Sequence, residues 1–215
     1  MRNCHCDVAI VNRGCDAFAG SQHSSGTIRL AQGPDIKAEG AASIEDRRLA
    51  RLYAYWCSKR PSAGAWPSRE AIDPLDIPQL LPYLMLVEIH GPDRFFFRLV
   101  GTNVARGIDP TGTYLADGAP GGPYRDHILA VFGEMPRRGQ PVYTISLYDD
   151  PEHDQRRTHR LFLPLEPKGG DPPLMLIGQV TEQDRMLLGS LWEIAPTRIS
   201  VATNIVLDGA PTADR

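Results

Sequence analysis

The first clear pattern of hydrophobic and polar positions is an amphipathic helix that follows a polar N-terminal stretch. Large apolar side chains recur there at helical spacing, at Leu49, Leu52, Tyr53 and Trp56. Ser43 is expected to cap this helix, and Pro61 is expected to end it. Such a stripe needs a surface to pack on. It can cover the chain's own sheet or pair with the same helix of a second chain.

Later segments alternate between strand and helix patterns. A hairpin is predicted first, with strands at Leu84 to His90 and Arg94 to Gly101 around the turn residues Gly91, Pro92 and Asp93. A longer helix is then predicted from Pro123 to a close at Pro136 and Gly139, and its apolar face carries Tyr124, His127, Ile128, Val131, Phe132 and Met135. Three more strands follow at Val142 to Tyr148, Thr158 to Leu165 and Leu174 to Thr181.

These elements predict an α+β fold and three parts of the chain. A five-stranded antiparallel sheet with helices on one face, plus the N-terminal amphipathic flanking helix, would occupy residues 43–185. Residues 1–42 are small and polar, and are expected to form a flexible extension. Residues 186–215 form a C-terminal extension whose apolar segments can dock on the core.

Composition narrows the partners and the location. The 215 residues are 42% hydrophobic and 23% charged, with a net charge of -3, which gives no overall attraction to nucleic acid or to an anionic membrane. The chain lacks an apolar run long enough to cross a bilayer and an N-terminal secretory pattern, so a cytoplasmic location is expected.

Several motifs together resemble the PAS-like domain family common in alphaproteobacteria, whose members are mostly uncharacterised. The motifs are Leu80-Leu81-Pro82-Tyr83-Leu84-Met85-Leu86, Phe97-Arg98-Leu99-Val100-Gly101-Thr102, Thr111-Gly112 and Leu163-Pro164-Leu165, with Tyr53, Tyr55 and Trp56 upstream. The resemblance covers about Ile44 to Asp184. It implies a small sensory or ligand-binding domain, often dimeric, whose sheet and helices enclose a pocket.

Candidate site residues follow from the patterns and from this resemblance. The expected pocket is lined by Phe97, Leu99, His127, Ile128, Phe132 and Phe162. His127 is interpreted as a buried, hydrogen-bonded imidazole, with ligation of haem iron as the alternative. Arg98 can anchor a carboxylate ligand or pair with Glu88 on the neighbouring strand. Leu49, Leu52, Tyr53 and Trp56 are the candidate contact of a homodimer.

Other polar clusters are interpreted without a binding role. Arg156, Arg157, His159 and Arg160 split between the two faces of a strand and predict a solvated hairpin. Cys4, His5, Cys6, Cys15 and His23 include zinc-type ligands, but their spacing fits no usual structural module, so no metal site is predicted. The four cysteines do not form a disulfide framework.

The leading hypothesis is a stand-alone PAS-like sensory module that acts through protein contacts and binds a ligand the sequence does not identify. One alternative is an interaction scaffold without a ligand. Another alternative is a small α+β enzyme. The sequence contains no nucleophile elbow, metal-binding helix motif or phosphate loop, so such a site would be built from scattered residues such as His127, Asp109 and Tyr143. An enzyme is the less favoured class.

Overall fold

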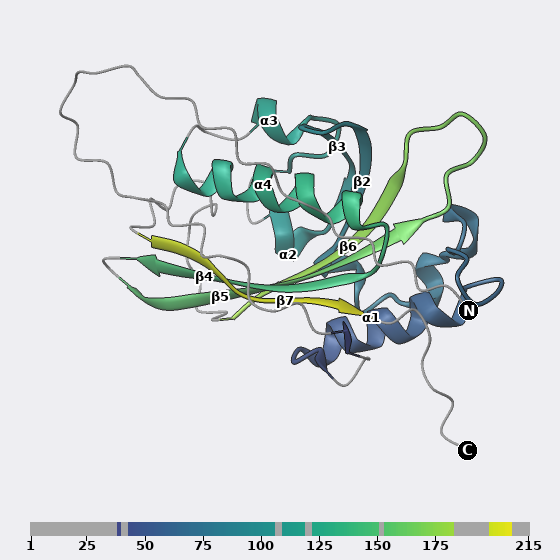
Figure 1. The fold of residues 1–215 in the computed structure, drawn as a ribbon, viewed down its shortest axis with the longest axis horizontal. Helices are drawn as coiled ribbons and strands as arrows, with labels where there is room; N and C mark the ends of the chain where they lie inside the picture. The colour runs from purple at the N-terminus through teal and green to yellow at the C-terminus, as the bar shows by residue number, and fades with distance from the viewer. Residues whose placement is uncertain are drawn as a thin grey trace, which may run out of the picture.

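Seven strands form one sheet in the order β1-β7-β4-β5-β6-β2-β3 in the computed structural model (Figure 1). The structure describes residues 38–39, 43–105, 109–118, 122–150, 153–182 and 198–207. The strands are β1 (Ala38–Glu39), β2 (Leu84–Gly91), β3 (Arg94–Val100), β4 (Val142–Asp150), β5 (His153–Leu165), β6 (Leu174–Thr181) and β7 (Arg198–Leu207). All neighbouring strands are antiparallel except β1 and β7, which are parallel.

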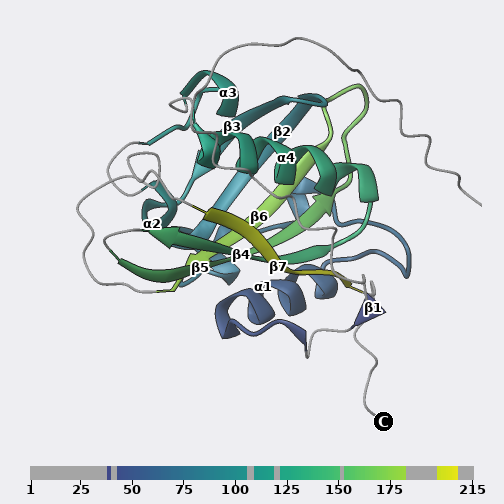
Figure 2. The same cartoon turned by 60° about the vertical axis from the view of Figure 1, so that its left-hand side comes forward.

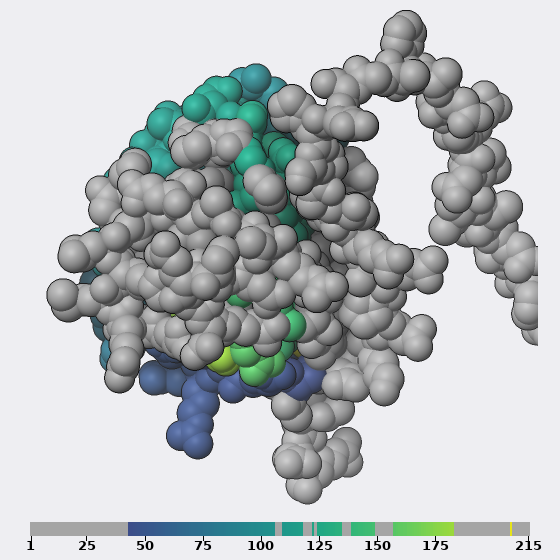
Figure 3. Space-filling model, turned by 90° about the vertical axis from the view of Figure 1, so that its left-hand side faces the viewer, coloured from purple at the N-terminus to yellow at the C-terminus, as the bar shows by residue number. Residues whose placement is uncertain are grey.

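Helices cover both faces of the sheet. Helix α4 (Pro123–Arg138) lies over one face and helix α1 (Arg47–Ser58) lies against the other (Figures 1 and 2). In Figure 3, teal atoms lie at the top of the molecule and purple atoms at the bottom, with green atoms directly above the purple ones. Short helices connect the elements: α2 (Thr102–Ala105), α3 (Leu115–Gly118) and the 3-10 turns Arg69–Ala71, Pro74–Asp76 and Leu81–Tyr83. We call the face beneath α4 the inner face and the face beneath α1 the outer face.

The predicted five-stranded antiparallel sheet is confirmed as the continuous part β4-β5-β6-β2-β3. The C-terminal extension adds strand β7 along β4, with Val142 opposite Val206. Ala38 and Glu39 pair with β7, so this part of the N-terminal extension joins the sheet instead of forming a flexible tail. The predictions for residues 1–37 and for Met186 to Trp192 lie outside the described residues.

Helix α1 begins later than its predicted cap. Asp46, not Ser43, is the N-cap, because its carboxylate accepts hydrogen bonds from the backbone N–H groups of Arg48 at 2.9 Å and Leu49 at 3.3 Å. Arg48 also pairs with the same carboxylate at 2.8 Å, and these contacts lower the pKa of Asp46 although burial opposes the shift. The helix ends at Ser58, before Pro61, as the proline predicts.

The apolar stripe of α1 packs on the outer face of the chain's own sheet. Its four large side chains are buried, with exposed fractions of 1% or less: Leu49, Leu52, Tyr53 and Trp56. A Cβ atom at Gly178 of β6 would lie 2.6 Å from Leu49 Cδ2, so the glycine lets the helix approach the strand closely. Because the sheet already takes up these side chains, the expected homodimer contact through them is not available in this fold. A homodimer stays a prediction without that contact.

The β2–β3 hairpin forms as predicted but contains a bulge. Leu86 lies opposite Leu99 and Val87 lies opposite Phe97, which leaves Arg98 as the extra residue. The bulge shifts the alternation, so Phe97 and Val100 are buried while Leu99 is 45% exposed. Leu99 is therefore wrong as a pocket residue.

Arg98 also points away from the interior. Its side chain is 56% exposed, and its Nε lies 3.4 Å from Glu88 Oε1. The structure thus gives Arg98 the pairing with Glu88 that the sequence allowed. The candidate role of Arg98 as the polar anchor of the ligand pocket does not fit this position, because the bulge leaves the guanidinium in solvent.

Helix α4 starts at Pro123 as predicted and runs through Pro136 to Arg138. Gly139 follows with a φ of 57°, in the left-handed region that ends many helices. None of the helices in the described ranges is long and apolar enough to cross a membrane.

Candidate ligand site

A buried group of polar side chains lies on the inner face, between α4 and the sheet. Helix α4 contributes Tyr124 and His127, and the three central strands contribute Thr144, Ser146 and Tyr148 from β4, Arg160 from β5 and Gln179 from β6. We call this group the Arg160 cluster. Its strand residues are neighbours by register, since Arg160 lies opposite Thr144 on one side and opposite Gln179 on the other.

Arg160 is the centre of this cluster and is fully buried, with an exposed fraction of 0%. Its Nε donates to Gln179 Oε1 at 2.7 Å. Its Nη1 donates to Tyr148 Oη at 3.1 Å and Ser146 Oγ at 3.3 Å, and its Nη2 donates to Tyr124 Oη at 3.3 Å. A guanidinium keeps its proton inside proteins, so the site holds a buried positive charge.

The acceptors around Arg160 are all neutral. Among the described residues no carboxylate pairs with this guanidinium, which is bonded to two phenols, one alcohol and one amide. Only the Nε bond is short, and the terminal nitrogens make bonds at the long end of the usual range. The side chain is thus positioned firmly at Nε, while the two nitrogens that grip carboxylates are held more weakly.

Thr144 adds a polar atom without a partner to the same place. Its residue is 1% exposed, and its Oγ1 has no hydrogen-bond partner among the described residues. Buried polar atoms in proteins are nearly always hydrogen-bonded, so this hydroxyl is a polar group beside the buried cation that a bound molecule could use.

His127 is a buried neutral imidazole next to this charge. Its Nε2 and Ser146 Oγ share a hydrogen bond at 3.0 Å, and its ring meets Tyr148 edge-on. Burial, and then the charge of Arg160, lower the pKa of His127 to about 3. The geometry is that of the hydrogen-bonded imidazole, and ligation of haem iron through Nε2 would first require this bond to break.

Tyr124 is a buried phenol in the same network, and it accepts a hydrogen bond from Arg160. Burial raises the pKa of Tyr124 above its ordinary value. Tyr124 therefore keeps its proton at neutral pH, and its hydroxyl group lies beside the terminal nitrogens of Arg160.

Most of the predicted pocket residues lie together at the apolar side of the cluster. Phe97, Ile128, Phe132 and Phe162 are each 5% exposed or less. Phe132 meets Phe162 edge-on at 5.6 Å between ring centroids, and Phe95, which the sequence analysis missed, meets Phe132 at 5.7 Å. Aromatic rings thus form one end of the inner interior, and the Arg160 cluster forms the other.

The basic cluster on β5 is wrong as a solvated hairpin. The predicted division of faces is correct, with Arg160 and Phe162 on the inner face and His159 on the outer face, but Arg160 and His159 are buried. The signal that could have found Arg160 is its spacing, since it shares a face with Phe162. The partners that make its burial tolerable come from α4, β4 and β6, and no local pattern reveals them.

The residues suggested for an enzyme site do not meet. His127 lies in the inner layer and bonds Ser146, whereas Tyr143 belongs to the outer core beneath α1. Asp109 is exposed in the loop after α2 and hydrogen-bonds the backbone of Thr111. The cysteine and histidine group at Cys4, His5, Cys6, Cys15 and His23 lies outside the described residues.

The strand order, the helix across the inner face and the buried cluster beneath it define a small α+β domain built on one antiparallel sheet. A family model described as PAS domain matches residues 44–179, which is more than half of the chain. The chain therefore belongs to the PAS domain family, a membership that indicates a sensory or ligand-binding module. A search of curated proteins finds none that matches.

Proposed function

We propose that this PAS domain is a sensory module that binds a small organic carboxylate at the Arg160 cluster. The observation that carries the proposal is a fully buried guanidinium whose partners among the described residues are all neutral. A buried charge without a counter-charge costs several kcal/mol, so an anion that reaches it gains strongly. The chain keeps a cation where an apolar side chain would be less costly, as functional sites often do.

The arrangement of donors favours a carboxylate over a neutral ligand. The terminal nitrogens of Arg160 form a planar fork that matches the two oxygens of a carboxylate. They release only weak bonds, at 3.1 to 3.3 Å, when they turn to such a ligand. The Thr144 hydroxyl, which has no hydrogen-bond partner among the described residues, is a further donor beside the fork.

The neighbouring apolar residues suit the rest of such a ligand. Phe132 and Phe162 lie between the same two layers as the Arg160 cluster. A molecule with one carboxylate and an apolar body would place its charge on Arg160 and its body toward these rings.

Output through protein contacts is part of the proposal. Strand β5 presents Arg160 to the inner face, and the residue before it, His159, to the outer face near the start of α1. A change of position at Arg160 would move the same strand on which the flanking helix rests. The partner that reads this change would contact α1 or the outer edge of the sheet.

Matched pairs of acids and amides test the proposal by thermal unfolding. Benzoate, hexanoate and similar acids are each compared with the corresponding amide, such as benzamide or hexanamide, which has nearly the same shape but no charge. At least one acid is expected to raise the midpoint of unfolding while its amide does not. The effect should disappear in Arg160→Gln and persist in Arg98→Gln, which removes an exposed guanidinium on the neighbouring hairpin.

Two outcomes would reject the carboxylate proposal. Stabilisation by an acid and its amide alike would show that charge is not recognised, and an equal effect in Arg160→Gln would place the binding elsewhere. If no compound in a broad set binds and a specific protein partner is found, the chain is the interaction scaffold that was the alternative.

A further inference from the structure

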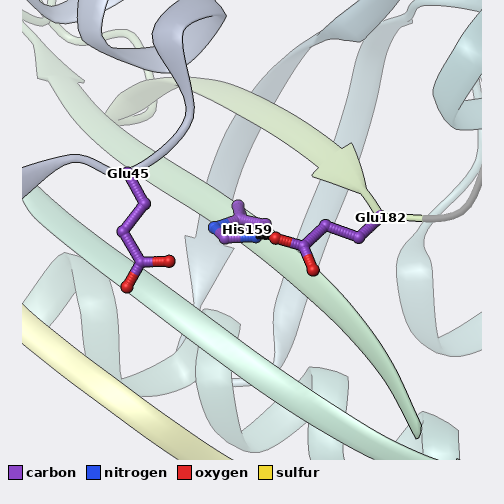
Figure 4. Close-up of side chains that lie close together, drawn as sticks. All are labelled: Glu45, His159 and Glu182. Carbon is purple, nitrogen blue, oxygen red and sulfur yellow. Dashed lines mark hydrogen bonds and ion pairs between the residues drawn. The ribbon is translucent and has the colours of Figure 1, made fainter.

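A second polar group lies on the outer face and has no role in the proposed carboxylate site. Glu45 comes just before α1, His159 lies on β5, and Glu182 follows the end of β6 (Figure 4). These three residues are far apart in sequence, yet one ligand atom from each lies within 4.8 Å of the others. We propose that they form a binding site for a divalent transition-metal ion, of which Zn²⁺ is the representative.

His159 is built like a metal ligand. The residue is 1% exposed, its Nδ1 lies 2.6 Å from Tyr143 Oη, and its ring stacks on the Tyr143 ring. The other nitrogen, Nε2, points at Glu182 Oε1 at 2.7 Å. Histidines that bind metals are commonly held at one ring nitrogen by an oxygen and present the other nitrogen to the ion. With a metal on Nε2, the ring proton resides on Nδ1 and is donated to the Tyr143 oxygen.

The two carboxylates supply charge and access. The side chains of Glu45 and Glu182 are 51% and 45% exposed, so both can rotate toward the ring and leave open positions for water. The ligand atoms already lie within 4.8 Å of one another, and rotations of these carboxylates would adjust them to the spacing of a coordinated set. One imidazole and two carboxylates suit zinc and its neighbours better than magnesium or calcium, which prefer all-oxygen sites.

Arg157 competes with the ion for the same carboxylates. Its Nη2 lies 3.2 Å from Glu45 Oε2, and its Nη1 lies 3.7 Å from Glu182 Oε1. Two carboxylates against one guanidinium leave a net negative charge that still attracts a divalent cation. The Arg157 side chain is 37% exposed and can turn into solvent when the ion binds. Removing this guanidinium should therefore tighten binding of the metal.

Bound metal would tie the flanking segment to the sheet. Glu45 is the residue before the cap of α1, whereas His159 lies on β5 and Glu182 directly follows β6, the two neighbouring strands under that helix. The ion would fasten the start of α1 across β5 and β6. The metal site lies on the outer face of the sheet and the carboxylate site on the inner face. The two proposals can therefore be tested, and rejected, independently.

Isothermal titration of Zn²⁺ into the full chain tests the site. Cys4, Cys6 and Cys15 are replaced by Ser in every protein, so that thiols at the N-terminus do not bind zinc. One ion per chain is expected, with affinity reduced at least about tenfold by Glu45→Gln, Glu182→Gln or His159→Gln.

Controls separate this site from nonspecific binding. Glu88→Gln should leave the affinity unchanged, although Glu88 also lies 3.0 Å from a histidine, because no third ligand joins that pair among the described residues. Arg157→Gln should raise the affinity. His159 is buried, so circular dichroism must show that the His159→Gln protein is folded. Glu45 and Glu182 are half-exposed, so their variants should stay folded and test the site even if His159→Gln does not fold. The absence of a one-to-one isotherm, or equal affinity in the parent, Glu45→Gln and Glu182→Gln proteins, would overturn the proposal.

Discussion

Burial of His127 makes the free energy of unfolding depend on pH. The imidazole pKa is about 3 in the folded protein, because burial and the charge of Arg160 disfavour the cation, and roughly 6.5 in the unfolded chain. Between these two pKa values, His127 therefore binds a proton in the unfolded state but not in the folded state. The stabilising contribution is fully present above about pH 6.5 and is lost progressively as the pH falls toward about 3.

The size of this effect follows from the two pKa values. Below the unfolded pKa the loss is about 1.4 kcal/mol for each pH unit, so lowering the pH from 7 to 5 should reduce the free energy of unfolding by about 2 kcal/mol through His127 alone. Asp46 does not contribute to the pH dependence between pH 7 and 5. Its pKa is lowered in the folded protein, so its stabilising contribution is lost only when the pH falls below its pKa in the unfolded chain, which is about 3.9.

Urea unfolding of the parent protein and of His127→Gln at several pH values between 7 and 5 measures the effect. Glutamine can still hydrogen-bond Ser146 but has no proton to gain, so the parent should lose about 2 kcal/mol more than the variant over this range. The other histidines are present in both proteins and cancel in the difference. Equal losses in the two proteins, or an NMR titration that shows a protonated His127 at pH 5, would refute the reasoning.

Three further predictions test the packing by urea unfolding. Gly178→Ala adds a methyl group 2.6 Å from a leucine of α1 and should cost about 1–3 kcal/mol, whereas Gly170→Ala, which meets open space, should change stability by less than about 0.5 kcal/mol. Trp56→Ala removes a buried ring whose Nε1 donates to a backbone carbonyl, so the substitution should lower the free energy of unfolding by about 3–5 kcal/mol. Light scattering combined with circular dichroism should then show a partly unfolded protein. It should not show a folded monomer that has separated from a dimer. Phe97→Ala should cost about 3–5 kcal/mol and Leu99→Ala less than about 1 kcal/mol, and equal costs would contradict the bulge.

Local patterns predicted the elements that periodicity alone determines. The stripe of α1 is buried as its spacing indicated, and the split of β5 into two faces is correct. These features depend only on residues close in sequence, since helical and strand spacing decide which side chains share a face. The N-cap was misplaced by three residues because Ser43 and Asp46 are both good caps, and only the structure shows whose side chain meets the free N–H groups.

The candidate site needed information from distant parts of the chain. One extra residue at Arg98 reversed the face of Leu99, and a bulge leaves no clear mark in a run of apolar and basic residues. Arg160 looked like part of a solvated turn because its partners on α4, β4 and β6 are 12 to 36 residues away. The Glu45 carboxylate is 112 residues from Arg157, so sequence spacing could not bring the outer cluster together.

Native mass spectrometry of the full chain tests the role of the Arg160 cluster most directly, because it detects a bound molecule whatever its identity. The parent protein, purified without harsh washing, should carry one small organic acid per chain, identifiable after release by its exact mass. Arg160→Gln, prepared in parallel, should appear at the bare mass of the chain, while Arg98→Gln should keep the added mass. A bare parent protein, or the same bound species in Arg160→Gln, would contradict recognition of an anion by the buried guanidinium.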